Sequence, residues 1–257
     1  MDGEGSKPFG RQNRDKGIDH MKFLKLALVA AAATVAMSGA AMAEDLKLSY
    51  NGGVVSDYVF RGVSQTQEDP AIQGGIDLTY GIGYAGVWAS NVDFGTDDPS
   101  AEIDVYAGLR PTMGDTSFDL GVLYYSYIDD KAPPTSPPVA SPGSFSYLEF
   151  KAAVSRPIGP ATAGIAAYYS PQYPLTKGSS LYYELNASIP VVDKLTLSGA
   201  VGEQEISQGA EYATWNVGLT YALTSNISAD LRYSDTDEHD LGKIYGDRVV
   251  IGLKAAF

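Results

Sequence analysis

The residues of this sequence whose types and spacing could do chemistry are polar and charged side chains at alternate positions of otherwise apolar runs. Successive side chains of a strand point to opposite faces, so these residues would share one face and the apolar residues the other. Ions on an enclosed face must be paired or hydrated, which predicts either a water-filled passage or a salt-bridged network that closes it. The candidate lining residues are Asp57, Arg61, Gln73, Asp77, Glu102, Asp104, Arg110, Glu149, Lys151, Glu184, Arg232, Arg248 and Lys254, and the alternation adds Lys47, Asp119 and Asp230 to the same face.

Asp57 and Arg61 are the most informative pair of this face. If one strand covers residues 46–63, the two side chains lie roughly 13 Å apart, too far to pair directly. Each then needs a partner on a neighbouring strand, and Gln73, Asp77 and Arg248 are available. The group predicts either a constriction built around Arg61 or a structural network that joins the first and last strands. Across the whole face a slight acidic excess favours cations modestly.

The elements that must position these side chains are strands, because alternation with a period of two recurs from end to end and no stretch shows a helical apolar stripe. The fold is therefore predicted to be all-β. The expected strands are 46–63, 70–81, 84–94, 101–110, 116–128, 144–156, 160–170, 179–189, 193–203, 211–222, 226–235 and 246–257.

The connections between these strands alternate in length. The short ones are 81–83, 111–114, 157–159, 190–192 and 223–225, and the long ones are 64–69, 95–100, 129–143, 171–178, 204–210 and 236–245. An antiparallel up-and-down transmembrane β-barrel of about 12 strands has this asymmetry, with short periplasmic turns and long external loops. A soluble sandwich has no reason to alternate so regularly. A barrel of twelve strands is intermediate between small barrels, whose interior side chains can fill, and large ones, which leave an open channel. We expect a narrow pore, with a closed barrel as the alternative.

The long loops are acidic. Exposed carboxylates keep a loop soluble, which is the simpler interpretation, and they also suit divalent cations that would bridge to anionic lipopolysaccharide. No loop has the spacing of a dedicated calcium site, so we predict no metal centre. The acidic stretches are 68–69, 97–98, 129–130 and 235–240, and the segment 131–142 is proline-rich, semi-rigid and too short for a plug domain.

Aromatic residues are expected at both boundaries of the apolar face, as in the aromatic girdles of membrane barrels. The chain ends on Phe257, directly after a strictly alternating run, which resembles the terminal strand that the barrel assembly machinery recognises. We expect Phe60, Tyr124, Tyr169, Tyr183 and Tyr233 at the external boundary, and Tyr80, Phe118, Tyr221 and Phe257 at the periplasmic one.

The N-terminal region predicts export. Residues 21–43 hold two lysines, an apolar run too short to span a bilayer, and a small-x-small cleavage pattern, so a signal peptide would be cut between Ala43 and Glu44. Residues 1–20 are expected to result from a start codon assigned too far upstream, or to be a non-native extension. Residues 1–43 contain six of the 18 basic and four of the 31 acidic side chains, so residues 44–257, the barrel domain, carry a formal net charge of −15. This charge argues against nucleic acid as a partner, and the lack of cysteine excludes disulfides.

Catalysis is not expected. Barrel enzymes of the outer membrane mostly use a histidine as general base, and the predicted mature chain has only His239, in an acidic loop with no serine that resembles a nucleophile elbow. Glu102 and Asp104 share a strand face, but no third catalytic group accompanies them. We predict no catalytic residue and no cofactor.

Three segments carry a resemblance to a known family. They are Ser56-Asp57-Tyr58-Val59-Phe60-Arg61-Gly62-Val63-Ser64-Gln65-Thr66, Pro70-Ala71-Ile72-Gln73-Gly74-Gly75 and Gly86-Val87-Trp88-Ala89-Ser90-Asn91-Val92. The first segment is long and specific, and the chain closely resembles the TorF family of proteobacterial porin-like proteins. The resemblance implies a Gram-negative outer-membrane location and a porin-like role, and it supplies no catalytic or ligand residues.

The expected function is therefore passive diffusion of small solutes or ions through an outer-membrane channel. A non-conducting structural or adhesion barrel, and a barrel enzyme, are the alternatives. The expected partners are outer-membrane lipid, lipopolysaccharide, the barrel assembly machinery and the diffusing solutes.

Overall fold

A computed structural model describes residues 46–95, 99–130, 144–174, 176, 178–207 and 209–257. The expected extension 1–20, signal peptide 21–43, cleavage site at Ala43 and Glu44, acidic pair 97–98 and proline-rich segment 131–142 lie outside these residues, so those predictions stay predictions. Within the described part of the chain, no helix is long and apolar enough to cross a bilayer.

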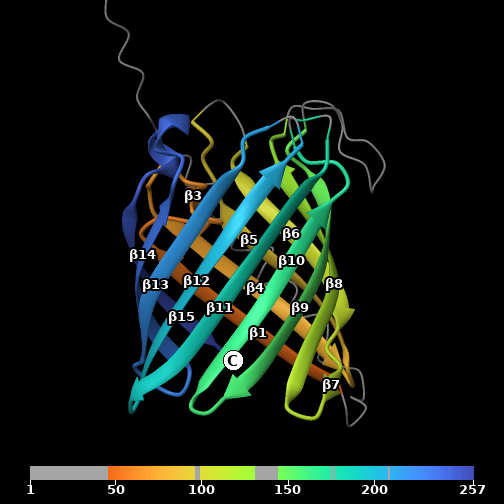
Figure 1. Ribbon diagram of the computed structural model, residues 1–257, viewed down its shortest axis with the longest axis vertical. Coiled ribbons are helices and arrows are strands. Elements are labelled where there is room, and N and C mark those ends of the chain that lie inside the picture. The colour runs from red at the N-terminus through yellow and green to blue at the C-terminus, as the bar shows by residue number, and fades with distance from the viewer. Residues whose placement is uncertain (1–45, 96–98, 131–143, 175, 177, 208) are drawn as a thin grey trace, which may run out of the picture. The chain divides into compact units, whose positions relative to one another are not determined.

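Twelve antiparallel strands form a closed barrel (Figure 1). Each pairs with the strand before it in the chain, and the last pairs with the first, from Asn51 opposite Ala256 to Val55 opposite Gly252. This confirms the predicted fold. The strands are β1 (Leu46–Val55), β4 (Ala71–Tyr80), β5 (Gly83–Asn91), β6 (Ala101–Leu109), β8 (Thr116–Ile128), β9 (Tyr147–Ile158), β10 (Ala161–Ser170), β11 (Ser180–Val192), β12 (Leu195–Ile206), β13 (Tyr212–Ala222), β14 (Ile227–Thr236) and β15 (Arg248–Ala256).

The outer face of the barrel is apolar. On β15, Val249, Ile251 and Leu253 are 60%, 62% and 47% exposed, and equivalent Leu, Ile and Val residues are exposed on most other strands. A soluble monomer rarely exposes so large a continuous apolar surface. Contact with membrane lipid accounts for this surface. The closed barrel also leaves no unpaired strand edge in the membrane.

The last residue completes the closure between β15 and β1. Phe257 exchanges both backbone hydrogen bonds with Tyr50, at N to O distances of 2.9 and 3.0 Å. The two rings stack with centroids 5.4 Å apart. The terminal aromatic residue is thus part of the barrel wall.

Two details of the wall differ from the sequence-based expectation. Residues 190–192 are not a turn, because β11 continues through a bulge to Val192 and the turn lies at Asp193 and Lys194. The periplasmic connection after β6 also holds a two-residue strand, β7 (Thr112–Met113), paired with β8. The alternation of short and long connections is unaffected.

The larger difference concerns the first expected strand, 46–63. β1 ends at Val55, and residues 56–70, here called the inner hairpin, contain a separate pair of short strands, β2 (Val59–Phe60) and β3 (Val63–Ser64). The turn between them is Arg61-Gly62, with φ of 49° and 84°. Positive φ at both central residues is typical of a type I′ hairpin turn, which glycine favours. The alternating pattern continues through residue 63, so periodicity alone could not show that the chain leaves the wall.

Candidate functional site in the barrel lumen

The tip of the inner hairpin is held by a buried ion pair. The Arg61 guanidinium donates to both carboxylate oxygens of Glu149 on β9 at 2.8 Å, and to the Gln204 side chain on β12 at 3.0 Å. The side chains of Arg61 and Glu149 are 5% and 0% exposed. A bidentate pair of this kind fixes orientation as well as charge.

Aromatic rings complete the environment of Arg61. Its guanidinium carbon lies 4.5 Å from the ring centroids of Phe60 and Tyr182 and 5.0 Å from that of Tyr168. Phe60 itself packs against Tyr125, so it lies inside the barrel. The prediction that Phe60 belongs to the external girdle is therefore wrong, because it lies on the hairpin and not on the wall.

The base of the inner hairpin is tied to the seam between the first and last strands. Asp57 accepts hydrogen bonds from Ser64 at 2.6 Å, from Thr66 at 3.1 Å and from Arg248 on β15 at 3.1 Å. The other nitrogens of Arg248 donate to the carbonyl oxygens of Lys243, Ile244 and Gly246 in the last external loop. Arg248, one of the three expected partners, is thus the partner of Asp57.

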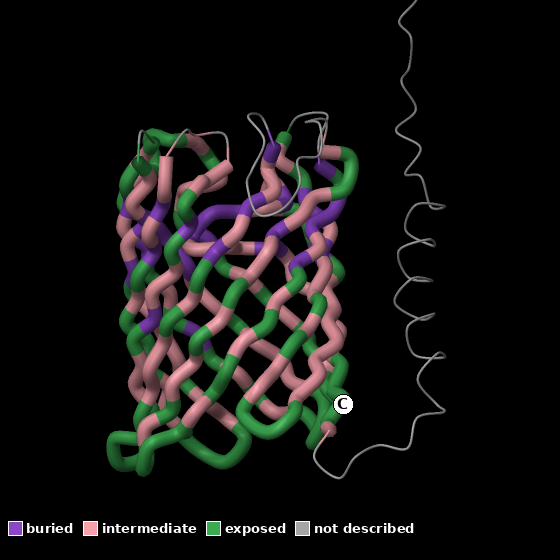
Figure 2. Tube along the Cα trace, turned by 90° about the vertical axis from the view of Figure 1, so that its right-hand side faces the viewer, coloured by how far each residue is buried: buried purple, intermediate pink, exposed green. Residues whose placement is uncertain are grey.

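Between base and tip, the hairpin contacts several other strands. Tyr58 donates to Glu102 on β6 at 3.1 Å, and its ring meets Trp88 on β5 edge to face at 5.4 Å. Gly62 lies so close to Thr214 and Thr236 that no side chain would fit there. The hairpin therefore crosses the lumen from the seam to the strands opposite. Figure 2 shows buried positions gathered towards the end of the barrel that carries the long loops.

Glu102 and Asp104 lie on β6, where Glu102 accepts the hydrogen bond from Tyr58 of the hairpin. They are 2% and 8% exposed, and one carboxylate oxygen of Asp104 is buried without a hydrogen-bond partner in the described part of the chain. Neither forms an ion pair with a described cation. A buried ionised carboxylate without a cation is costly, so this pair contributes little negative field to the open lumen.

The rest of the lumen holds two charge clusters whose side chains are more exposed. Asp119 accepts from Lys151 at 2.8 Å, from the Tyr84 hydroxyl at 2.7 Å and from Arg110 at 3.3 Å. Arg110 is 56% exposed, so solvent screens its pair with Asp119.

The second cluster centres on Arg232. This side chain donates to Asp230 on its own strand, to Asn216 at 2.7 Å and to Ser198 at 2.9 Å. Asp230 in turn accepts from the Thr220 hydroxyl at 2.7 Å. The charge of Arg232 is therefore compensated within the wall.

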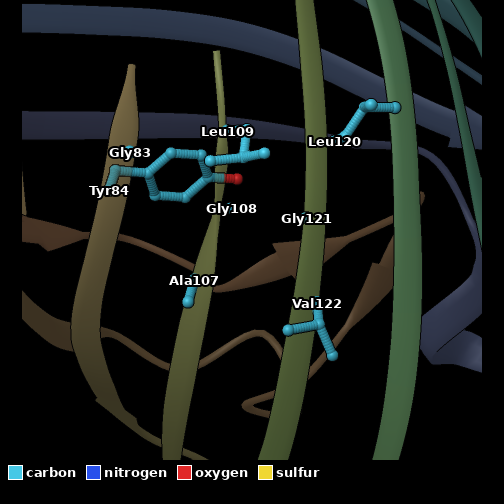
Figure 3. Close-up of a pocket in the computed structure, with 8 residues that line it drawn as sticks. All are labelled: Gly83, Tyr84, Ala107, Gly108, Leu109, Leu120, Gly121 and Val122. Carbon is cyan, nitrogen blue, oxygen red and sulfur yellow. The ribbon is translucent and has the colours of Figure 1, made fainter. Parts of the chain in front are cut away.

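Glycines allow lumen aromatic rings to lie flat against the wall. Figure 3 shows Tyr84 on β5 extending over Gly108 towards Gly121 on the next two strands. A Cβ atom at either glycine would come within 2.6 Å of the Tyr84 hydroxyl oxygen. Tyr106 covers Gly86 in the same way and donates to Asp77 at 2.7 Å. These two tyrosine rings thus lie along the wall over glycines.

An open cavity of about 310 Å³ adjoins the inner hairpin at Trp88. Its wall is built by β1, β4 and β5 on one side and by β13, β14 and β15 on the other. Lumen-facing Gly53 and Gly252 make room for it. The lining residues that carry polar or aromatic side chains are Asn51, Gln73, Trp88, Thr220, Ser228, Asp230, Arg232 and Lys254.

The sequence-predicted lining residues thus fall into two groups. The side chains of Asp57, Arg61, Glu149 and Arg248 are buried where the inner hairpin is held, and Glu102 and Asp104 are buried on β6. In contrast, Gln73, Asp77, Lys151, Glu184, Arg232 and Lys254 lie on wall strands, and Arg110 directly follows β6. Arg61 pairs with Glu149 across the lumen and with neither Gln73 nor Asp77. The roughly 13 Å separation from Asp57 assumed one continuous strand and does not apply.

Sequence reasoning missed Gln204 and Tyr58. Gln204 lay one residue beyond the expected strand 193–203, whereas β12 runs to Ile206 and places it on the inner face, fully buried. Extending the alternation by one residue would have found it. Tyr58 gave no signal of its own, because its role depends on the hairpin.

The fold and its apolar belt define a porin-like β-barrel of the outer-membrane type. The chain belongs to the family described as bacterial protein of unknown function (Gcw_chp), which matches residues 39–256. A search of curated proteins finds no significant match.

Among solved structures, the barrel is similar to the KdgM porin, with a TM-score of 0.55 and 10% identity over 82% of this chain and 98% of that chain. The NanC porin gives a TM-score of 0.51, also with 10% identity over 82% and 98% of the two chains. The KdgM porin in complex with disordered oligogalacturonate gives the same TM-score, identity and coverage as NanC. At 10% identity, this structural similarity shows that the chain shares the fold of these porins.

Proposed function

We propose that this protein is an outer-membrane channel through which small polar solutes or ions diffuse passively, the role implied by its resemblance to the TorF family. The observation that carries the proposal is the contrast between the two faces of one closed barrel. The outer face is apolar, whereas the inner face holds partly exposed charge clusters and an open cavity of about 310 Å³. A barrel built only as a membrane anchor needs no hydrated interior.

The fold comparison supports this class of function, because the named neighbours KdgM and NanC are porins. It supports no catalytic role, and we propose none. Outer-membrane lipid, lipopolysaccharide and the barrel assembly machinery are proposed as partners on the strength of the apolar belt, the acidic external loops and Phe257.

Charge selectivity follows from which lumen charges stay accessible. Arg61 and Arg248 are buried against Glu149 and Asp57, and Glu102 and Asp104 are buried as well. The remaining lumen charges are Lys47, Arg110, Lys151, Arg232 and Lys254 against Asp77, Asp119, Glu184 and Asp230. We therefore propose a slight preference for anions in the open lumen, opposite to the sign expected when all charges were counted.

The test is the reversal potential of the refolded protein in planar bilayers under a salt gradient. Discrete conductance steps with a reversal potential slightly on the anion-selective side are expected, with a shift towards zero as salt screens the lumen. A cation-selective wild type would show that the acidic loops or the buried acids dominate the field.

A closed structural barrel is the second candidate, and the inner hairpin is the observation that favours it. Its tip and base are both held by buried ion pairs on different strands. Absence of conductance in the wild type, and also in a variant lacking the hairpin, would select this candidate.

A further inference from the structure

We propose that the lumen cavity beside the inner hairpin is a binding site for a small hydroxylated carboxylate, recognised by Lys254, Gln73, Asn51 and Trp88. The proposal rests on the proposed channel function, since it assigns a solute class to that lumen.

The charge of the cavity points to an anion. Its charged lining residues are Asp230, Arg232 and Lys254. Asp230 and Arg232 neutralise each other through two contacts of 3.2 Å. Lys254 has no hydrogen-bond or ion-pair partner among the described residues, and its side chain is exposed to the lumen. One uncompensated ammonium group is therefore presented in a chain whose formal net charge is −13.

The neighbours of Lys254 point to hydroxyl groups on the ligand. Strand register places Ser228, Lys254, Gly53 and Gln73 in one row across β14, β15, β1 and β4. The side-chain amide of Gln73 has no hydrogen-bond partner among the described residues, and neither has that of Asn51. An amide offers two donors and one acceptor oxygen, which suits the mixed donor and acceptor character of hydroxyl groups.

An aromatic surface completes the site. The row next to Lys254 runs from Asn51 through Gly75 to Trp88. The absence of a side chain at Gly75 lets the indole approach, since a Cβ there would lie 3.4 Å from Trp88 Cδ1 and 3.3 Å from the Asn51 amide nitrogen. An indole beside two amides and one ammonium group fits a compact ligand with a C–H face, a ring of hydroxyls and a carboxylate. A bare inorganic anion would use Lys254 alone.

Trp88 also supplies the measurement. The sequence has two tryptophans, and Trp215 lies on the lipid-facing side of β13. In a Trp215→Phe background the fluorescence of the refolded protein in detergent reports on Trp88. Sodium D-glucuronate is titrated as the probe at constant ionic strength, and D-glucose serves as the uncharged analogue of the same ring.

The expected result is a saturable fluorescence change with D-glucuronate and a dissociation constant about tenfold larger for D-glucose. Lys254→Gln should weaken D-glucuronate binding about tenfold and leave D-glucose unchanged. Gln73→Ala should weaken both. Lys47→Gln is the matched control, because Lys47 is a lumen-facing lysine of β1 outside the cavity, and it should change neither titration.

Two results would overturn the site: no saturable change with D-glucuronate, or equal effects of Lys254→Gln and Lys47→Gln. Because the titration does not require conduction, saturable binding by a protein that forms no channels would reject the proposed function and retain the site. Conduction without saturable binding would reject the site and retain the proposed function.

Discussion

At the scale of single residues, burial decides which charges act on the lumen. Arg61 has the type and position expected of a constriction residue, yet its charge is compensated by Glu149 and enclosed by aromatic rings. Its function in this structure is to hold the inner hairpin across the barrel. Lys254, another of the predicted lining residues, keeps an accessible charge.

Replacing Arg61 with Ala should destabilise the hairpin, because Glu149 would be left as an uncompensated buried charge. Breaking one partner of such a pair costs about 3–5 kcal/mol. Unfolding in denaturant, monitored by the loss of the heat-modifiable form of the barrel, would measure this cost. Adding Glu149→Gln should recover part of the loss, and Arg110→Ala, at a pair that is 56% exposed on the arginine side, should cost less than about 1 kcal/mol. Equal effects of Arg61→Ala and Arg110→Ala would contradict the assignment.

His239 should titrate above its ordinary range. Its Nε2 lies 2.7 Å from an Asp235 carboxylate oxygen, and this contact raises the pKa of His239. Because the folded-state pKa is the higher one, the contact stabilises the loop fully below the unfolded pKa of about 6.5 and is lost as pH rises through the folded value. NMR titration of the imidazole should show a raised pKa that falls in Asp235→Asn. The same pKa in both proteins would exclude the contact.

At the scale of elements, the wall was predictable and the inner hairpin was not. Twelve strands and their alternating connections follow from a period of two, because lipid outside and water inside impose opposite preferences on the two faces. The chain leaves the wall at residue 56 while the alternation continues to residue 63, so only the long-range pairing of Arg61 with Glu149 distinguishes a hairpin inside the barrel from a strand in its wall. Partners 88 residues apart in the chain leave no local signal.

The terminal strand makes a prediction at this scale. Deleting Phe257 removes two backbone hydrogen bonds and the stack on Tyr50, so less heat-modifiable barrel should assemble in the outer membrane. Phe257→Tyr keeps the ring and should assemble normally. Wild-type levels of assembled barrel in the deletion would show that closure does not depend on the last residue.

At the scale of the whole molecule, an exported barrel should have lost its predicted signal peptide. Recovered outer-membrane material should begin at Glu44, since the sequence predicts cleavage after Ala43. N-terminal sequencing tests this. Mature protein that retains residues 1–20 would refute both the cleavage site and the interpretation of those residues.

We propose a conducting barrel whose lumen is narrowed by residues 56–70. Val55 and Ala71 are register partners on adjacent strands, so a two-residue Asn-Gly turn can replace the inner hairpin without disturbing the wall. The matched control shortens residues 131–143 to two residues, since the flanking Ser144 and Asp130 are joined by a hydrogen bond of 2.6 Å.

The most direct measurement is the single-channel conductance of these two variants and the wild type in planar bilayers. The hairpin replacement is predicted to give steps several-fold larger than the wild type, because it clears the lumen, while the control matches the wild type. Equal steps in all three proteins would show that the hairpin does not limit the passage, and no steps in any of them would show that the barrel is not a channel.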